Sequence, residues 1–432
     1  MKKVFLVSFS VVSVIVMAQN RNLTLQEAID LSLQSNKKIK LLETQSKQAA
    51  LKVEEAKNMR LPDVNITTAA QYLPPTSDVT LDLGLPTSAT SAGSDVSPDY
   101  MLTFQAGASV PLFSGFKIKN GIAVAEYAQK AQDLNIDNQK QDASIQAIEL
   151  FSNLYKTQKA IAVVEENLKR SQNRVKDFTN FMNNGTVARN DLMRVQLQES
   201  NVELALAETK KNERILNYNL GLLLGLENEK LTPVMSNDRI EEAISEEDYL
   251  NKAHSGRKEF EMLDYQKKIA EKSVEIAKGN YYPSVALTAG YNYYKVGDNI
   301  TLAHSTSVGL GIKYNLSSLY KNKVAIAEAE AKALEVQNNV DLLNDAVKTQ
   351  IHSAYEEYQY AQEKMNVYQK ALSQAQENYR IVKTKYDNGL ATTDELLTAD
   401  VEELQAQLNK TYGESDIQLN YYKLLRQIGG IK

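Results

Sequence analysis

The sequence predicts a mainly α-helical fold with a β-barrel portion, built from two copies of one structural unit. Two stretches without proline, residues 112–232 and 284–432, permit very long helices because proline breaks a helix interior. Four short segments alternate between apolar residues and small or polar ones, which is typical of strands. Several short motifs recur at constant offsets along the chain, which indicates an internal duplication.

The composition excludes several classes of protein. The chain of 432 residues has no cysteine and only three histidines, so disulfide frameworks, thiol nucleophiles and Cys-ligated metal sites are excluded. The net charge of −5 and the lack of a long basic cluster argue against a nucleic-acid partner. Hydrolase and phosphate-binding motifs are missing. We therefore expect no catalytic residue, no cofactor, no metal site and no enzyme activity.

Residues 1–18 are predicted to be a secretory signal peptide. Lys2 and Lys3 form a basic start, an apolar segment follows, and Val16 and Ala18 give the small-residue pattern of a cleavage site. The apolar segment is shorter than the roughly 20 residues that a membrane-spanning helix needs. We therefore expect the mature chain to leave the cytoplasm.

The duplication predicts the organisation of the rest of the chain. Motifs of the first half recur in the second half at offsets of 221 and 204 residues. The difference between these two offsets comes from a longer loop in the first copy, at 73–100, which is rich in proline and serine. We expect a first repeat at 19–230, a joint at 231–243 and a second repeat at 244–432. The matching motifs are Ala56-Lys57 and Pro62 with Ala277-Lys278 and Pro283, and Asn184-Gly185 with Asn388-Gly389.

Each repeat is expected to contain the same elements in the same order. A helix of about forty residues, at 23–59 or 245–279, leads into two strands, and very long helices follow. Apolar residues recur every seven positions in the long helices, which predicts antiparallel coiled coils. An Asn-Gly pair is expected to end the first long helix, with its glycine in the left-handed conformation. The strands are expected at about 62–72, 101–112, 283–294 and 304–316.

The predicted strands have the length of strands that cross a bilayer with a tilt, about 9–11 residues. A sheet that faces lipid has to close, and four strands are too few to do so. Identical chains could pool their strands as a dimer with eight or as a trimer with twelve, and a water-filled channel favours the trimer. Tyrosines such as Tyr72 and Tyr282 flank the strands, as in an interfacial aromatic belt.

Through its motifs the chain resembles the TolC-like outer-membrane efflux proteins. This resemblance implies a homotrimer with a 12-stranded barrel in the outer membrane of a Gram-negative bacterium, joined to a long α-helical barrel in the periplasm. It implies export through this duct, with a periplasmic adaptor protein and an inner-membrane pump of the RND or ABC type as partners. The matching segments are Leu23-Thr24-Leu25-Gln26-Glu27-Ala28-Ile29, Ala-Lys-x4-Pro-x-Val before the first and third strands, Val110-Pro111-Leu112-Phe113-Ser114-Gly115, and Tyr386-Asp387-Asn388-Gly389 with Glu395-Leu396-Leu397.

The resemblance also implies a periplasmic aperture at the two Asn-Gly turns. Asp191 and Glu395 match acidic residues that family members place around the constriction. Three chains would bring six such carboxylates near one axis, an arrangement associated with cation selectivity. The alternative is that both residues only provide a favourable charge at a helix N-terminus. Gly185, Gly389 and Tyr386 belong to the same turns.

Two positions depart from the family pattern at these turns. Ala391 stands where an arginine can tie the turn shut, and Thr398 stands where a second acidic residue can occur. Arg189 of the other turn is the candidate substitute for this latch. The exported substrate, whether drug, metal ion or protein, stays open.

The alternative function is an exported coiled-coil scaffold or adhesin without a pore. Such a protein would share the heptad pattern, but it would not need four strands of bilayer length. Detergent-dependent solubility and the size of a trimer would distinguish the two.

Overall fold

A computed structural model describes residues 20–72, 74, 100–235, 244–297 and 300–431. The predicted signal peptide, most of the 73–100 loop and residues 236–243 of the predicted joint lie outside the described residues. The described chain is mostly helical. It divides into a helical unit, made of Met1–Leu42, Asn135–Phe260 and Leu343–Lys432, and a strand unit, made of Glu43–Leu134 and Glu261–Leu342.

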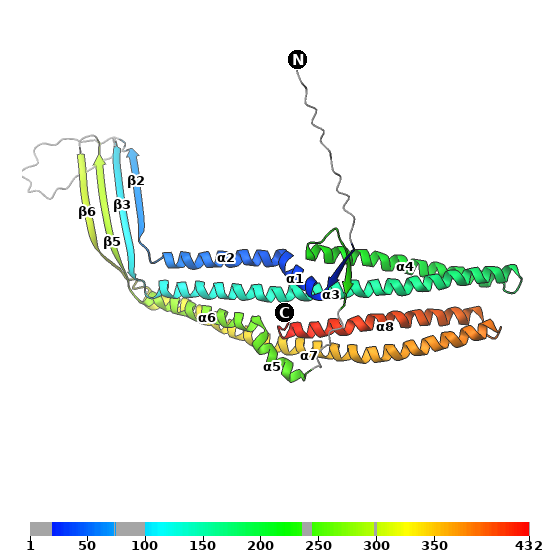
Figure 1. The fold of residues 1–432 in the computed structure, drawn as a ribbon. Coiled ribbons are helices and arrows are strands. Elements are labelled where there is room, and N and C mark those ends of the chain that lie inside the picture. The colour runs from blue at the N-terminus through cyan, green and yellow to red at the C-terminus, as the bar shows by residue number, and fades with distance from the viewer. Residues whose placement is uncertain (1–19, 73, 75–99, 236–243, 298–299, 432) are drawn as a thin grey trace, which may run out of the picture. The chain divides into compact units, whose positions relative to one another are not determined.

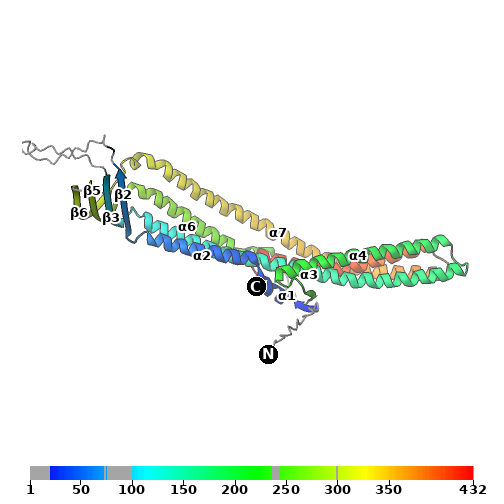
Figure 2. The ribbon, with the colours of Figure 1, turned by 90° about the horizontal axis from the view of Figure 1, so that it is seen from above.

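Two antiparallel helix hairpins dominate the helical unit. The first joins the C-terminal part of α3 (Lys117–Asn183) to α4 (Arg189–Leu224), and the second joins that of α7 (Ser318–Asp387) to α8 (Thr393–Gln427). The hairpins lie side by side with their turns at the same end (Figures 1 and 2). With 67 and 70 residues, α3 and α7 are each about 100 Å long at 1.5 Å per residue, which confirms the predicted long helices. None of the described helices combines the length and apolar character of a membrane-spanning segment.

The single forty-residue helices predicted at 23–59 and 245–279 are wrong, because each is broken once. At Asn36 the backbone is extended, and the side-chain Oδ1 accepts hydrogen bonds from the amides of Lys38 and Ile39 at 2.9 and 3.2 Å. Such a bond starts a new helix instead of continuing the old one. Arg257 is likewise extended, with φ −76° and ψ 120°. The resulting helices are α1 (Leu25–Ser35), α2 (Lys37–Asn58), α5 (Glu246–Gly256) and α6 (Lys258–Lys278).

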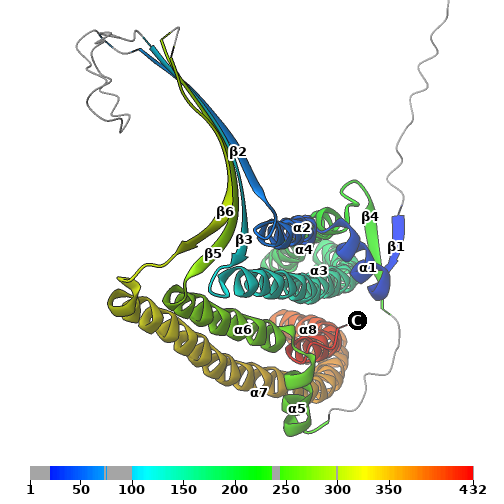
Figure 3. The same ribbon diagram turned by 90° about the vertical axis from the view of Figure 1, so that its left-hand side faces the viewer.

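A two-stranded parallel sheet, not predicted from the sequence, lies in the helical unit. It pairs β1 (Asn20–Thr24) with β4 (Lys230–Val234), which Figure 3 shows beside each other. Leu23 and Leu231 are fully buried and belong to a core with Phe151 and Leu154 of α3. Pro233, expected in the joint, pairs with Leu23 inside this sheet.

The four predicted strands are confirmed and form one antiparallel sheet in the order β2-β3-β5-β6 (Figures 1 and 3). The last strand begins and ends earlier than expected, because a short turn follows β5. The strands are β2 (Asp63–Tyr72), β3 (Tyr100–Phe113), β5 (Ser284–Val296) and β6 (Ile300–Lys313), with a 3₁₀ turn, η1 (Gly279–Tyr281), before β5.

The two outer strands expose apolar side chains. Val64 and Ile66 of β2 are each 68% exposed, and Val308, Leu310 and Ile312 of β6 are 66–75% exposed. Along each strand these residues are two positions apart and therefore share one face of the sheet. Within the described chain, neither β2 nor β6 has a partner strand on its outer edge. The sheet thus presents an apolar face and two open edges.

A cluster of ion pairs links the break between α5 and α6 to the end of α8. Glu259 accepts a hydrogen bond from Arg257 at 2.9 Å, and Arg426 lies 3.8 Å from the same carboxylate and 2.7 Å from Asp142. Burial alone would raise the pKa of Glu259, but the hydrogen bond from Arg257 and the charges of both arginines hold the pKa below its ordinary value. This carboxylate is therefore charged in the folded chain.

Glu259→Gln is expected to remove part of the acid sensitivity of the fold. Because the pKa of Glu259 is lower in the folded chain, its ion pairs stabilise the fold above the unfolded pKa of about 4.5, and this contribution is lost as pH falls through the folded pKa. The wild-type Tm should therefore fall more steeply below that pH than the Tm of the variant. Circular dichroism melts at several pH values measure this, with the exposed Glu247→Gln as control. Parallel curves for wild type and Glu259→Gln would contradict the prediction.

Candidate functional site

The predicted site residues lie at the two turns that end the helix hairpins (Figure 1). Gly185 and Gly389 both have φ of 73°, the left-handed conformation expected from the two Asn-Gly pairs. The amide of Gly185 donates to the carbonyl of Met182 at 3.0 Å, and that of Gly389 donates to the carbonyl of Tyr386 at 2.9 Å. These bonds satisfy carbonyls that a helix end leaves free and fix the path of each turn.

Gly185→Ala and Gly389→Ala are each expected to destabilise the protein by about 1–2 kcal/mol. A Cβ at either position would meet no atom within 4 Å, so the cost comes only from the left-handed backbone. Gly121→Ala is the matched control, because its Cβ would also meet nothing but the residue lies inside α3. That control should be stabilising by roughly 0.5–1 kcal/mol. Thermal melts of the three variants measure the change in Tm relative to wild type. An equal change in Tm at all three positions would contradict this account.

A cavity of about 680 Å³ lies between the two turns. The first hairpin contributes Asp191, at the start of α4, to the cavity lining, and the second hairpin contributes Tyr386 and Gly389. The ring of Tyr386 stacks on that of Phe178, with centroids 5.7 Å apart and planes 15° apart. Burial raises the pKa of the Tyr386 hydroxyl, and the nearby charge of Asp191 raises it further. Asp191, Tyr386 and Gly389, which the sequence assigned to the two turns, thus line one cavity within the chain.

Glu395 has a different environment from Asp191. Its carboxylate accepts hydrogen bonds from the amide of Thr392 at 2.6 Å and from the Thr392 hydroxyl at 2.9 Å, which completes a capping box at the start of α8. These two bonds hold the pKa of Glu395 below its ordinary value. Glu395 is not among the residues that line the cavity. Within one chain it acts as a helix cap.

The remaining predicted residues stay apart from the cavity. Arg189 forms no hydrogen bond or ion pair with any described residue, so the structure gives no latch through Arg189 within one chain. Thr398 lies in the second turn of α8, with its side chain exposed. The ion pair that does connect the hairpins here joins Arg194 to Asp394 at 3.4 Å. Both of its members are more than half exposed, so it contributes at most about 1 kcal/mol.

A buried ion pair, which sequence reasoning missed, joins the two hairpins farther from the turns. The guanidinium nitrogens of Arg174 in α3 lie 3.0 and 3.1 Å from the carboxylate oxygens of Asp400 in α8. The Arg174 side chain is 9% exposed and that of Asp400 is 1% exposed. Burial opposes the charge of Arg174, but the bonds to Asp400 hold its pKa above the ordinary value. A second pair, Arg170 with Glu403 at 3.0 Å, follows one turn away.

The sequence does contain a signal for these buried charges. Asp400 and Glu403 lie four and seven positions after Leu396, which is buried, so the helical repeat places all three on one face of α8. Carboxylates on an apolar face have to find cationic partners. Within the described residues, no group of three or more His, Asp or Glu side chains is arranged to hold a metal ion.

Comparison with known proteins shows that one family profile matches most of the chain. The profile of the outer membrane efflux protein family matches residues 28–226 and 249–430. Among curated proteins, the outer membrane efflux protein BepC of Brucella suis biovar 1 (strain 1330) is 23% identical over 345 residues, which cover 78% of this chain and 75% of BepC. The residues matched by the family profile include both hairpins.

Several solved structures share this fold. VceC, an outer membrane protein of Vibrio cholerae, superposes with a TM-score of 0.77 at 18% identity, over 94% of this chain and 96% of VceC. CusC superposes with a TM-score of 0.80 at 14% identity, over 94% of this chain and 92% of CusC. The open state of the MtrE channel of Neisseria gonorrhoeae superposes with a TM-score of 0.72 at 14% identity, over 94% of this chain and 89% of MtrE. At these identities the likeness concerns the fold.

Proposed function

The chain belongs to the outer membrane efflux protein family, and from this membership we propose that it forms the trimeric exit duct of an efflux or secretion system. As an outer-membrane protein with a large periplasmic helical part, it conducts its substrate across the outer membrane instead of transforming it chemically. The proposed partners are a periplasmic adaptor protein and an inner-membrane pump of the RND or ABC type. The substrate class, drug, metal ion or protein, depends on that pump.

The observation that carries the proposal is the open four-stranded sheet with its exposed apolar face. Its strands have 10 to 14 residues, enough to cross the hydrocarbon core with a tilt. Inside a bilayer the free edges of β2 and β6 would leave backbone groups without hydrogen bonds. Three chains arranged around an axis satisfy these edges by pairing β6 of one chain with β2 of the next, which gives a 12-stranded barrel.

The proposed organisation of the chain follows from the order of its elements. Both halves contain a broken helix, two strands and two long helices in the same order. We take these as two structural repeats, at 19–230 and 244–432, connected by the joint at 231–243 and preceded by a signal peptide at 1–18. The helix turns at Gly185 and Gly389 form the periplasmic aperture, where each chain contributes Asp191, Tyr386 and, farther along α8, Thr398. Arg189, exposed and without a partner among the described residues of its own chain, can meet a neighbouring chain there.

Engineered disulfides test the proposed closure, because the native chain has no cysteine. Thr67→Cys on β2 combined with Gly309→Cys on β6 places the two thiols at opposite edges of the sheet in one chain. Since neighbouring β6 positions can be scanned, the exact inter-chain register does not have to be known in advance.

Oxidation is expected to link two and three chains covalently, and the detergent-solubilised particle should contain three chains and conduct ions in planar bilayers. Each single cysteine variant serves as control. A monomer that is soluble without detergent, does not cross-link and does not conduct would contradict the proposal and favour the exported scaffold.

A further inference from the structure

Two residues of opposite charge lie on the two open edges of the four-stranded sheet, at the same end. Asp63 is the first residue of β2, and Lys313 is the last residue of β6. Because each strand of the sheet is antiparallel to the next, the start of β2 and the end of β6 lie at one end of the sheet. In these four described strands the remaining Asp, Glu, Lys or Arg residue is Lys295, on the inner strand β5.

Both charged residues lie on the face of the sheet opposite to the exposed apolar side chains. Residues that are directly opposite share a face, and this link runs from Asp63 across the sheet through Ser109, Thr288 and Gly309. Lys313 lies four positions after Gly309 and therefore on the same face, whereas the exposed valine and isoleucine side chains of the outer strands alternate with these positions. In the barrel proposed above, the apolar face contacts lipid, so both charges face the interior.

Neither charge has a partner among the described residues of its own chain. Both side chains are exposed, and the residues opposite them on the adjacent strands, Ser109 and Ser284, are uncharged. The side chains of Asp63 and Lys313 form no hydrogen bond or ion pair with any described residue. Each open edge thus carries one unpaired charge, which is negative on β2 and positive on β6.

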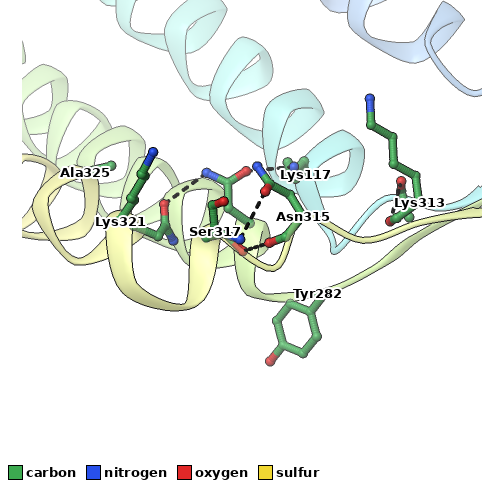
Figure 4. A pocket seen from close by; sticks show the side chains of 11 residues that line it. Lys117, Tyr282, Lys313, Asn315, Ser317, Lys321 and Ala325 are labelled. Carbon is green, nitrogen blue, oxygen red and sulfur yellow. Dashed lines mark hydrogen bonds between the residues drawn. The ribbon is translucent and has the colours of Figure 1, made fainter.

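The surroundings of Lys313 increase the positive charge at the end of β6. Together with Lys117 and Lys321 it lines a cavity of about 480 Å³, and no carboxylate is among the described lining residues. Figure 4 shows Lys313 and Lys321 extended toward the same side of the ribbon, whereas the ring of Tyr282 points the opposite way. The first turns of α7 also line this cavity, and the dipole of that helix favours negative charge at its start. The end of β6 therefore favours a carboxylate from outside its own chain.

Pairing of β6 with β2 of the next chain would bring the two charges together. This pairing is antiparallel, so it continues the alternation of the sheet. A register with Thr67 opposite Gly309, the two positions chosen for cysteine above, also places Asp63 opposite Lys313, because each lies four residues toward the same end. In the registers shifted by two residues, the two charges remain diagonal neighbours about 7–8 Å apart, within reach of a lysine side chain.

The rest of this edge specifies the register only weakly. A slip of one residue would turn the apolar side chains toward the interior, but a slip of two residues keeps every side chain on its own face. On the interior face, the second half of β6 carries only the small residues Ser307, Gly309 and Gly311 before Lys313. Glycine-rich strands are prone to slip, so a charge pair is what distinguishes these registers.

We propose that Asp63 of one chain forms an ion pair with Lys313 of the next chain at each β6–β2 junction of the trimer, and that these pairs select the partner edge and its register. Opposite charges on facing strands are stabilising, and like charges directly opposite each other are destabilising. Such complementarity contributes more to register and to the rejection of wrong partners than to affinity. This inference rests on the proposed function, because it requires the chains to close a shared barrel.

Charge reversal in the full-length protein tests the ion pair. Asp63→Lys alone or Lys313→Asp alone places like charges at every junction, so the detergent-solubilised trimer should dissociate at a lower temperature than wild type on native gels. The charge-swapped variant, Asp63→Lys with Lys313→Asp, restores opposite charges and should regain most of the wild-type dissociation temperature. Lys295→Asp is the matched control, because it makes the same charge change on a strand that has partners on both edges. An equal loss in the single and charge-swapped variants, or in the control, would overturn the proposal.

Co-expression of wild-type and charge-swapped chains measures the selection of partners. The two chains carry tags of different mass, and native mass spectrometry counts the trimers of each composition. A mixed trimer has like charges at both junctions between unlike chains, so mixed trimers should be several-fold rarer than random assortment gives. Random assortment would overturn the proposal. Wild-type chains that form no trimer would instead contradict the proposed function, so the two failures are distinguishable.

Discussion

Asp400→Asn is expected to destabilise the protein by about 3–5 kcal/mol, more than any other single change considered above. The substitution keeps the shape of the side chain but leaves the charge of Arg174 buried without its carboxylate partner, and only the Tyr379 hydroxyl, 3.4 Å away, stays near it. The contact between α3 and α8 should therefore weaken first. Thermal melts of the detergent-solubilised protein measure the loss as a lower Tm.

A double variant separates the cost of the unpaired charge from the value of the pair. Arg174→Met with Asp400→Leu removes both charges and fills the space with apolar groups, which is often neutral or stabilising for a buried pair. Its Tm should return close to the wild-type value. The exposed pair supplies the control, because Asp394→Asn next to Arg194 should change stability by less than about 1 kcal/mol. Equal losses for Asp400→Asn and Asp394→Asn would show that the burial of the first pair does not matter.

The sequence was a good guide to features that depend on local periodicity. Proline-free heptads predicted α3 and α7, because a repeat of seven residues keeps one helical seam apolar. Alternation predicted β2, β3, β5 and β6 to within a few residues. The left-handed turns at Gly185 and Gly389 were predictable because few other residues tolerate that conformation.

Features that depend on distant partners were not predictable in the same way. The parallel pairing of β1 with β4 joins segments about two hundred residues apart, and neither segment is long enough to show a pattern of its own. The break at Asn36 depends on its side-chain Oδ1, which accepts hydrogen bonds from two amides in the first turn of α2. Arg174 finds its partner Asp400 only because α3 and α8 pack together. In each case the decisive contact is tertiary.

The environments of the two carboxylates at the turns likewise could not be predicted from the local sequence pattern. Asp191 and Glu395 occupy equivalent places in the sequence, each in the first turn of a helix that follows a glycine turn. The side chains nevertheless differ in what they contact. Thr392 can form a capping box with Glu395, whereas Ala188, at the corresponding position before α4, offers no side-chain bond to Asp191. The N-cap residue of each helix, Ala188 or Thr392, thus decides whether the carboxylate three positions later is bound within the cap or remains available to face the cavity.

Asp191→Asn is therefore expected to reduce the cation preference of the channel strongly, whereas Glu395→Gln should leave the preference nearly unchanged. In the proposed trimer three Asp191 carboxylates line the cavity side of the aperture, and a ring of such charges favours cations. The Glu395 carboxylate accepts its hydrogen bonds from Thr392, and a glutamine keeps one oxygen that can accept from the Thr392 amide, so its replacement should weaken the cap only slightly.

The reversal potential of reconstituted channels in a salt gradient measures the cation preference, and thermal melts measure any loss of stability from a weakened helix cap. The two variants are controls for each other, since each removes one negative charge from the same turn region. A shift in reversal potential for Glu395→Gln as large as that for Asp191→Asn would mean that both carboxylates face the pore, as the sequence pattern alone suggests. No shift for either variant would leave both as charges that only stabilise a helix N-terminus, because a group that faces the ion path cannot lose its charge without changing the local ion concentration.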